Sequence, residues 1–179
     1  MVVWVIVKEK VYQELKQGIP YCSTISDSPW DEETQESEVG FQFLMKQMYK
    51  EIGFPPKHDI VPVIAWHTYY GGREIPDKDE FLYLDKTGMI CLEIEIPDNK
   101  ILLIDALACT MLMEGEYISR SEELEELNAE LDEFNSMGVA KRAYETRRSW
   151  QRVFDISKSA YILGLFWQIE PQMVKKKVW

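Results

Sequence analysis

The spacing of apolar residues along this chain predicts both strands and helices. The opening segment 1–7 is an apolar run rich in β-branched residues, which is typical of a buried strand. In 89–96 every second residue from Ile90 onward is isoleucine or leucine, and this period of two indicates a strand with one face on a core. The strands predicted in this way cover 1–7, 61–67, 81–84, 89–96, 101–104 and 161–169.

Apolar residues three and four positions apart predict the helices. A helix over 8–17 carries its apolar residues on one face, and Gly18 is expected to end it. Ser119, with Glu122 three residues later, resembles a capping box that would begin an acidic helix. The further predicted helices cover 41–52, 119–134 and 143–154.

Together these segments predict one α+β domain over 1–179, with a mainly antiparallel sheet packed against about four to five helices. The chain of 179 residues has the usual size of a single domain. The segments 81–84, 89–96 and 101–104 follow one another through short turns, so we expect them to form a meander at the centre of the sheet.

The composition indicates an acidic cytoplasmic protein. The net charge of −11 repels a polyanion, so direct binding to nucleic acid is not expected. Cys22, Cys91 and Cys109 are odd in number and lack metal-ligand spacing, which favours free thiols in a reducing compartment. No apolar run approaches the roughly 20 residues of a membrane span, and the opening run lacks the features of a signal peptide.

The common catalytic motifs are missing from the sequence. It has no glycine-rich phosphate loop, no zinc-hydrolase motif and no paired Cys-x-x-Cys, and His58 and His67 are its only histidines. Glu93, Glu95 and Asp105 are hard oxygen donors that would suit Mg²⁺ or Mn²⁺, but the solvent-facing side of a sheet is the favoured interpretation. We therefore expect no cofactor and no metal, and we assign no catalytic residue.

A ligand site is the strongest functional hypothesis that the residues support. Trp66, His67, Tyr69 and Arg73 follow one another where a predicted strand meets a Gly-Gly turn. Aromatic rings stack on planar ligands, and an arginine supplies the charge that attracts an anion. These four residues predict a concave site for a small anionic, ring-containing ligand, although a core tryptophan beside ordinary turn aromatics remains the alternative.

Two arginines of the later helix are further candidates. Arg148 and Arg152 lie four positions apart and therefore share one helix face, from which they would join the ligand site. The alternative, which we favour for such a helix, is that its cations pair with the acidic segment 122–133.

The whole chain resembles a family of bacterial and phage proteins, the domain of unknown function numbered three thousand eight hundred and forty-one. The resemblance implies one domain and carries no activity. The residues that carry it are Trp4 in the first strand, Leu15-x-x-Gly18, Pro62-Val-Ile-Ala-Trp66, Leu92-Glu-Ile-Glu-Ile-Pro-Asp98, Ile101-Leu-Leu-Ile-Asp105, Trp150-x-x-Val-Phe154 and Phe166-Trp167.

Three classes of function remain open at this point. The leading hypothesis is a binding or regulatory protein that holds a small anionic or nucleotide-like ligand or docks on a protein partner. The opening strand and helix also resemble ADP-ribosyltransferase-like domains, which would imply an NAD-using enzyme with Glu170 as the nearest acid to the last strand. An acidic protein that mimics nucleic acid and inhibits a host enzyme is the third class.

Overall fold

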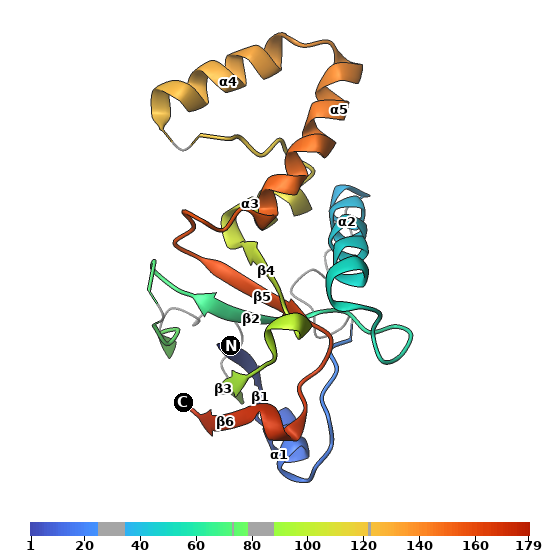
Figure 1. The fold of residues 1–179 in the computed structure, drawn as a ribbon, viewed down its shortest axis with the longest axis vertical. Coiled ribbons are helices and arrows are strands. Elements are labelled where there is room, and N and C mark those ends of the chain that lie inside the picture. Colours follow the sequence, from blue (N-terminus) through green and yellow to red (C-terminus); the bar gives the residue numbers. More distant parts are fainter. Residues whose placement is uncertain (25–34, 73, 79–87, 122) are drawn as a thin grey trace.

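The computed structural model describes residues 1–24, 35–72, 74–78, 88–121 and 123–179. The described strands form one six-stranded sheet in the order β4-β5-β2-β1-β3-β6 (Figure 1). Every neighbouring pair is antiparallel, as predicted. The strands are β1 (Val2–Lys8), β2 (Val63–Thr68), β3 (Met89–Glu95), β4 (Leu102–Asp105), β5 (Ile162–Phe166) and β6 (Val174–Lys177).

Five α-helices accompany the sheet in the described part of the chain, which confirms the predicted α+β class. They are α1 (Glu9–Lys16), α2 (Gln35–Ile52), α3 (Ala106–Met113), α4 (Leu124–Ser136) and α5 (Val139–Ser149). The 3-10 helices η3 (Asp98–Lys100), η4 (Trp150–Phe154) and η5 (Pro171–Met173) lie between elements. Gly18 and Gly53 follow α1 and α2 with φ of 85° and 82°, which is the left-handed region that favours glycine. None of the helices described is both long and apolar enough to cross a membrane.

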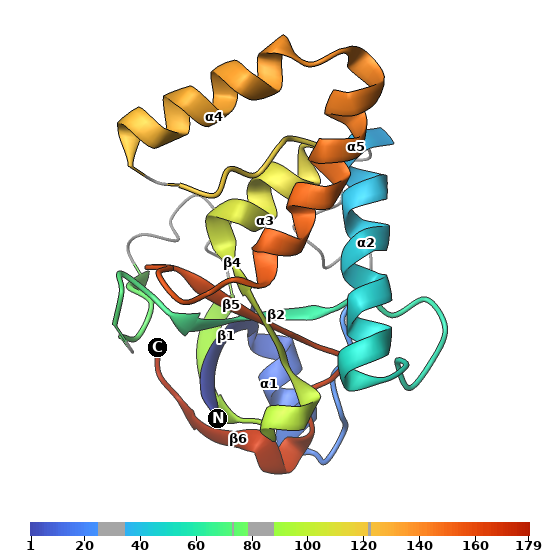
Figure 2. The same ribbon diagram turned by 45° about the horizontal axis from the view of Figure 1, so that its top comes forward.

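The sheet separates two groups of buried side chains. On one face Leu92 and Phe166 pack with Leu15 of α1, and on the other Leu165 packs with Leu112 of α3. Leu165 and Phe166 are consecutive and face opposite cores, as the period of two along a strand requires. Figure 2 shows the same division, with α1 on one side of the sheet and α2, α3 and α5 on the other.

The strand order contradicts the predicted central meander. β3 pairs with β1 on one side and with β6 on the other, whereas β4 lies at the opposite edge beside β5. The connection between β3 and β4 explains why the predicted meander is wrong. Ile96 and Ile101 both lie in the core cluster that contains residues of α1, so the chain crosses that core instead of turning back beside β3. The predicted strand 81–84 lies outside the described residues.

Two helix starts also differ from the prediction. The sequence pattern misses α3 because apolar residues surround this short helix and leave no period of 3.6 residues. Its start is fixed by Asp105, whose carboxylate accepts a hydrogen bond from the Ala108 N–H at 2.7 Å. Ser119 does not cap α4: its hydroxyl donates to the Ser121 carbonyl, and Glu123 is the residue before the helix. Glu122, the other half of the predicted capping box, lies outside the described residues.

A glycine lets α2 and α3 approach each other closely. A Cβ atom added to Gly40 would lie 2.5 Å from the carbonyl oxygen of Leu112, a backbone atom that has little freedom to move. Leu44, one helical turn further along α2, is fully buried in the same core. The contact therefore fixes the end of α3, from which the chain continues toward α4.

Helix α4 stands away from the rest of the fold. It joins the body through the segment 114–123 at one end and through α5 at the other, and it arches over α3 in both ribbon views (Figures 1 and 2). None of its residues is buried, and Leu124 is 70% exposed. Its half-buried apolar stripe is therefore too small to anchor it, and polar contacts must contribute to its position.

Candidate functional site

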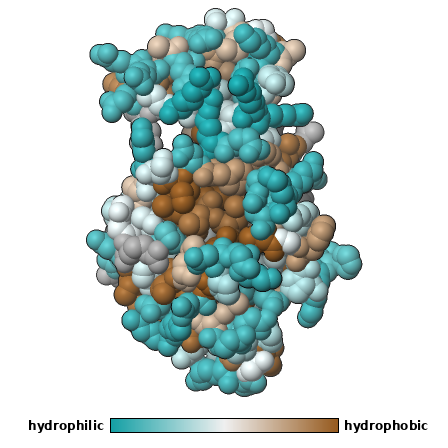
Figure 3. Space-filling model, viewed as in Figure 1, coloured by the Kyte–Doolittle hydropathy of each residue, from teal (hydrophilic) through white to brown (hydrophobic). Residues whose placement is uncertain are grey.

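A cavity of about 540 Å³ lies between α4, α5 and the segment 117–121. This volume falls in the range of roughly 300–1,000 Å³ that is usual for small-molecule sites. Figure 3 shows hydrophilic side chains in the upper part of the molecule, where α4 lies, above the hydrophobic surface in the middle of this face. The cavity walls carry cations (Arg120, Lys141, Arg148), acids (Glu126, Glu130, Glu133, Glu145) and the rings of Tyr117 and Phe134.

One wall of the cavity, the segment 116–118, is bound tightly to the base of α5. The indole N–H of Trp150 donates to the Glu116 carbonyl at 2.9 Å. The Ile118 N–H donates to the Ser149 hydroxyl at 2.9 Å, and the Arg152 guanidinium donates to the Ile118 carbonyl. Because Trp150 and Ser149 are themselves buried, this wall is a rigid part of the domain.

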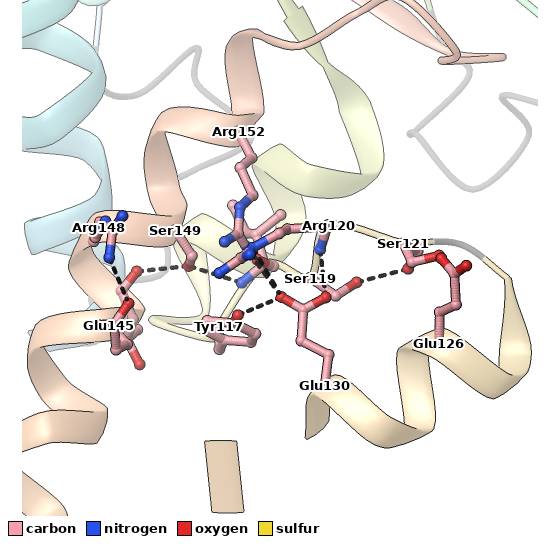
Figure 4. A network of polar contacts seen from close by, with 12 residues as sticks. Tyr117, Ser119, Arg120, Ser121, Glu126, Glu130, Glu145, Arg148, Ser149 and Arg152 are labelled. Atoms are coloured by element: carbon pink, nitrogen blue, oxygen red, sulfur yellow. Dashed lines mark hydrogen bonds and ion pairs between the residues drawn. The ribbon is translucent and has the colours of Figure 1, made fainter. Parts of the chain in front are cut away.

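Glu130 ties α4 to that wall (Figure 4). Its carboxylate accepts hydrogen bonds from the Tyr117 hydroxyl at 2.5 Å, from the Arg120 backbone N–H at 2.9 Å and from the Arg152 guanidinium at 3.3 Å. Burial alone would raise the pKa of Glu130, but the hydrogen bonds from Tyr117 and Arg120 and the charges of Arg152 and Arg120 outweigh it and lower this pKa. The carboxylate is therefore ionised at neutral pH.

An aromatic pair and an exposed cation complete the cavity. The rings of Tyr117 and Phe134 stack with centroids 4.3 Å apart, and the Arg152 guanidinium lies 5.3 Å from the Tyr117 ring centroid. Arg148 is 65% exposed and lies 3.5 Å from Glu145 on its own helix. Exposed pairs of this kind are weak, so Arg148 is available to a ligand.

The lowered pKa of Glu130 predicts a pH dependence of stability. A carboxylate whose pKa is lower in the folded state stabilises the fold above its ordinary pKa of 4.5, and this contribution disappears as the pH falls through the folded-state value. The Glu130→Gln variant lacks the contribution at every pH. The difference in free energy of unfolding between wild type and variant, measured by urea denaturation, should therefore shrink between about pH 6 and about pH 3. A constant difference would contradict this account of Glu130.

The aromatic residues predicted as a ligand site form a cluster of their own near the end of β2. Trp66 and Tyr69 meet edge to face at 5.0 Å, and Tyr161 lies 5.6 Å from Tyr69. Tyr69 is buried, and a ring nitrogen of His67 lies 2.9 Å from the Thr68 hydroxyl. Arg73, the fourth predicted residue, lies outside the described residues.

The two predicted arginines belong to the cavity network and not to the cluster around Trp66. Arg152 contacts Glu130 and Ile118, and Arg148 lines the cavity beside Glu145. The ion pair between Arg152 and Glu130 agrees with the predicted pairing with the acidic segment, whereas Arg148 pairs with Glu145 of its own helix. The structure thus divides the five predicted site residues that it describes between two places.

The three acids that would suit a metal ion do not come together. Glu93 and Glu95 pair with Lys176 and Lys175 of the neighbouring strand β6, and Glu93 lies 3.2 Å from Lys176. Asp105 caps α3 from the opposite edge of the sheet. The part of the chain that the structure describes contains no group of three metal-ligating side chains.

The three cysteines are free, as the sequence predicts. Burial raises the pKa of Cys91 and of Cys109 to about 12, so neither thiol is ionised at neutral pH. Burial also raises the pKa of the half-buried Cys22. None of the three therefore has the character of a catalytic nucleophile.

Comparison with known families agrees with the resemblance in the sequence. Residues 2–175 match a family described as a domain of unknown function (DUF3841). The chain belongs to this family. The match runs from β1 into β6 and includes the whole cavity, so the site lies inside the family domain. No curated protein and no solved structure matches the chain.

Of the residues that line the cavity, sequence reasoning identified Arg148 alone as a site residue, and those it missed include Tyr117, Arg120, Glu130 and Lys141. One of them carries a signal in the sequence. Glu130 follows Leu127 by three positions and precedes Phe134 by four, so it lies on the apolar side of an amphipathic helix. A carboxylate in that position needs a partner, whereas the other acids of α4 need only water.

Proposed function

We propose that this protein is a binding domain that holds a small anionic, nucleotide-like molecule in the cavity below α4. The observation that supports this most directly is a set of three donors beside the rigid wall at 116–118: the Tyr117 hydroxyl, the Arg120 N–H and the Arg152 guanidinium converge on one carboxylate. Three donors that converge on one anion form an anion-binding group, and charge-assisted hydrogen bonds of this kind are the strong ones.

The remaining cavity residues favour a ligand with several polar groups. Lys141 and Arg148 offer further positive charge, while Glu145 is an acceptor for hydroxyl or amino groups. The ring of Tyr117, on which Phe134 stacks, provides a surface for a planar ring. A molecule that combines an anion, hydroxyl groups and a ring fits this set.

The cavity supports binding more than it supports catalysis. Its described lining contains no histidine, cysteine or serine, which leaves carboxylates, a lysine and a tyrosine as its candidate general bases and nucleophiles. The lowered pKa of Glu130 also makes it a weak base at neutral pH. The proposed role is therefore recognition of the ligand.

The alternative functions have less support from the geometry. An ADP-ribosyltransferase-like enzyme would bind NAD in a cleft between two sheets, and the described strands here form a single sheet. Glu170, the first acid after β5 in the sequence, accepts a hydrogen bond from the Gln168 amide. A nucleic-acid mimic would use the exposed acids of α4, but exposed acids on a helix are common and indicate no partner by themselves.

Two adjacent arginines provide a test of the binding site. Arg148→Ala should weaken binding of a nucleotide by about tenfold or more, because hydrogen bonds to charged groups contribute about 1.5–3 kcal/mol. Arg147→Ala is the matched control, since Arg147 is exposed on the same helix and does not line the cavity. Affinities for mononucleotides, NAD and cyclic dinucleotides are measured by titration calorimetry at concentrations up to the millimolar range.

One result of comparing Arg148→Ala with Arg147→Ala would contradict the proposed location of the site. If wild type binds a member of the panel and both variants bind it equally well, Arg148 is not part of the site and the proposed location is wrong. Absence of binding across the whole panel would contradict the proposed ligand class.

A further inference from the structure

We infer that α4 occupies the ligand site with its own side chains, so that Glu130 and Phe134 hold the positions of the ligand's anion and ring. This inference rests on the proposed function and adds how α4 regulates ligand binding. Binding would then displace α4 from the segment 116–121. The protein without ligand is therefore in an autoinhibited state. The ligand it selects carries a phosphate or carboxylate together with a planar ring.

The contacts of Glu130 are those expected of a bound anion. Its side chain is 16% exposed, and three donors from outside α4 converge on its two oxygens: the Tyr117 hydroxyl, the Arg120 N–H and the Arg152 guanidinium. A phosphate or carboxylate of a ligand would accept the same hydrogen bonds. An anionic ligand must therefore compete with Glu130 for these donors.

Phe134 covers the place where a ligand's ring would stack. It lies on the same face of α4 as Glu130, four positions later, and its ring is nearly parallel to that of Tyr117, with an interplanar angle of 21°. The Arg152 guanidinium also lies over the Tyr117 ring, so this ring is already part of the anion-binding group. One helix face thus presents a carboxylate and an aromatic ring together, which is the combination proposed for the ligand.

The segment 116–118 would keep its position if α4 moved away. The Glu116 carbonyl and both backbone groups of Ile118 are bound by residues of α5 and η4, so their positions do not depend on α4. Helix α4 itself has no buried residue, so its departure exposes little apolar surface. The protein can therefore adopt two arrangements, one with α4 packed against this segment and one with α4 displaced from it. A ligand that binds only the second arrangement shifts the protein toward it.

The Glu130→Gln variant tests this inference with three probes: adenosine monophosphate, inorganic phosphate and adenosine. Glutamine keeps the size of the side chain and removes its charge, so it is a weaker competitor for Arg152. We expect the variant to bind adenosine monophosphate and phosphate about tenfold more tightly than wild type, with no comparable gain for adenosine. Glu125→Gln is the matched control, because Glu125 is an exposed acid of α4 that does not line the cavity.

Hydrogen exchange provides a second measurement, on unmodified protein. Adenosine monophosphate should accelerate amide exchange in 124–136 if it displaces α4. Slower exchange there would show that α4 closes over the ligand, and this result would overturn the inference. Phe134→Ala provides a second variant, in which binding of adenosine monophosphate should also tighten because the Tyr117 ring becomes accessible.

The outcomes separate the two proposals. If wild type binds adenosine monophosphate and Glu130→Gln binds it no more tightly, the displacement of α4 is wrong while the binding function stands. If wild type and every variant fail to bind both adenosine monophosphate and phosphate, the proposed function and the inference are both wrong.

Discussion

Leu92→Asp should lower the free energy of unfolding by about 4 kcal/mol or more, which is a large part of the roughly 5–15 kcal/mol that stabilises a typical domain. Leu92 is fully buried in β3, where it pairs with Val5 of the central strand β1. An aspartate at this position has no partner, so the fold must bury an unpaired carboxylate or bind a proton at a high cost. Urea denaturation followed by circular dichroism measures the loss.

The next residue along the strand provides the control. Glu93 lies on the other face of β3 in an ion pair with Lys176, and its side chain is 20% exposed. Glu93→Gln keeps the size and removes only this ion pair, so its effect should stay within about 1 kcal/mol. A Leu92→Asp protein with near-wild-type stability would contradict the register of β3.

Arg152→Ala should destabilise the domain by about 2 kcal/mol or more, far above the effect of an ordinary surface substitution. The substitution removes the guanidinium that binds the Ile118 carbonyl and leaves the Glu130 carboxylate without its nearest charge. Both side chains are mostly buried, with 24% and 16% exposure, so water replaces these contacts only in part. Chemical denaturation of the variant at neutral pH measures this loss.

Two further variants identify the origin of that loss. Arg148→Ala, in the preceding helix α5, should cost less than about 0.5 kcal/mol because its ion pair with Glu145 is exposed. A double variant with Glu130→Gln should recover part of the loss, since the uncharged side chain no longer needs Arg152. If Arg152→Ala and Arg148→Ala have equal effects, Arg152 does not hold the wall of the cavity.

Most elements of the fold could be predicted because they leave a local pattern, whereas α3 and β6 leave none. The alternation in 89–96 identifies β3, and the glycines at 18 and 53 mark the ends of α1 and α2. The order of the strands has no such local signal. β1 pairs with both β2 and β3, so that Trp4 lies opposite Trp66 on one side and Glu93 on the other, and neither partner is close to it in the sequence.

The candidate site could be predicted only in part for the same reason. Arg148 and Arg152 are recognisable as cations on one helix face, and both lie in the cavity network. Their neighbours Tyr117 and Arg120 come from a segment without regular periodicity, which is held in place by hydrogen bonds between its backbone and the side chains of Ser149 and Trp150. The cluster around Trp66 has the aromatic residues that a ligand site needs, but the structure places it apart from both arginines.

The measurement that tests this account most directly is a nuclear magnetic resonance titration of wild type with adenosine monophosphate. If the ligand binds below α4, the amide signals of 117–121, Glu130, Phe134 and Arg148 should shift with a single dissociation constant, while those of Trp66 and Tyr69 stay in place. Shifts confined to Trp66, Tyr69 and their neighbours would contradict the account and return the site to the aromatic cluster at the end of β2.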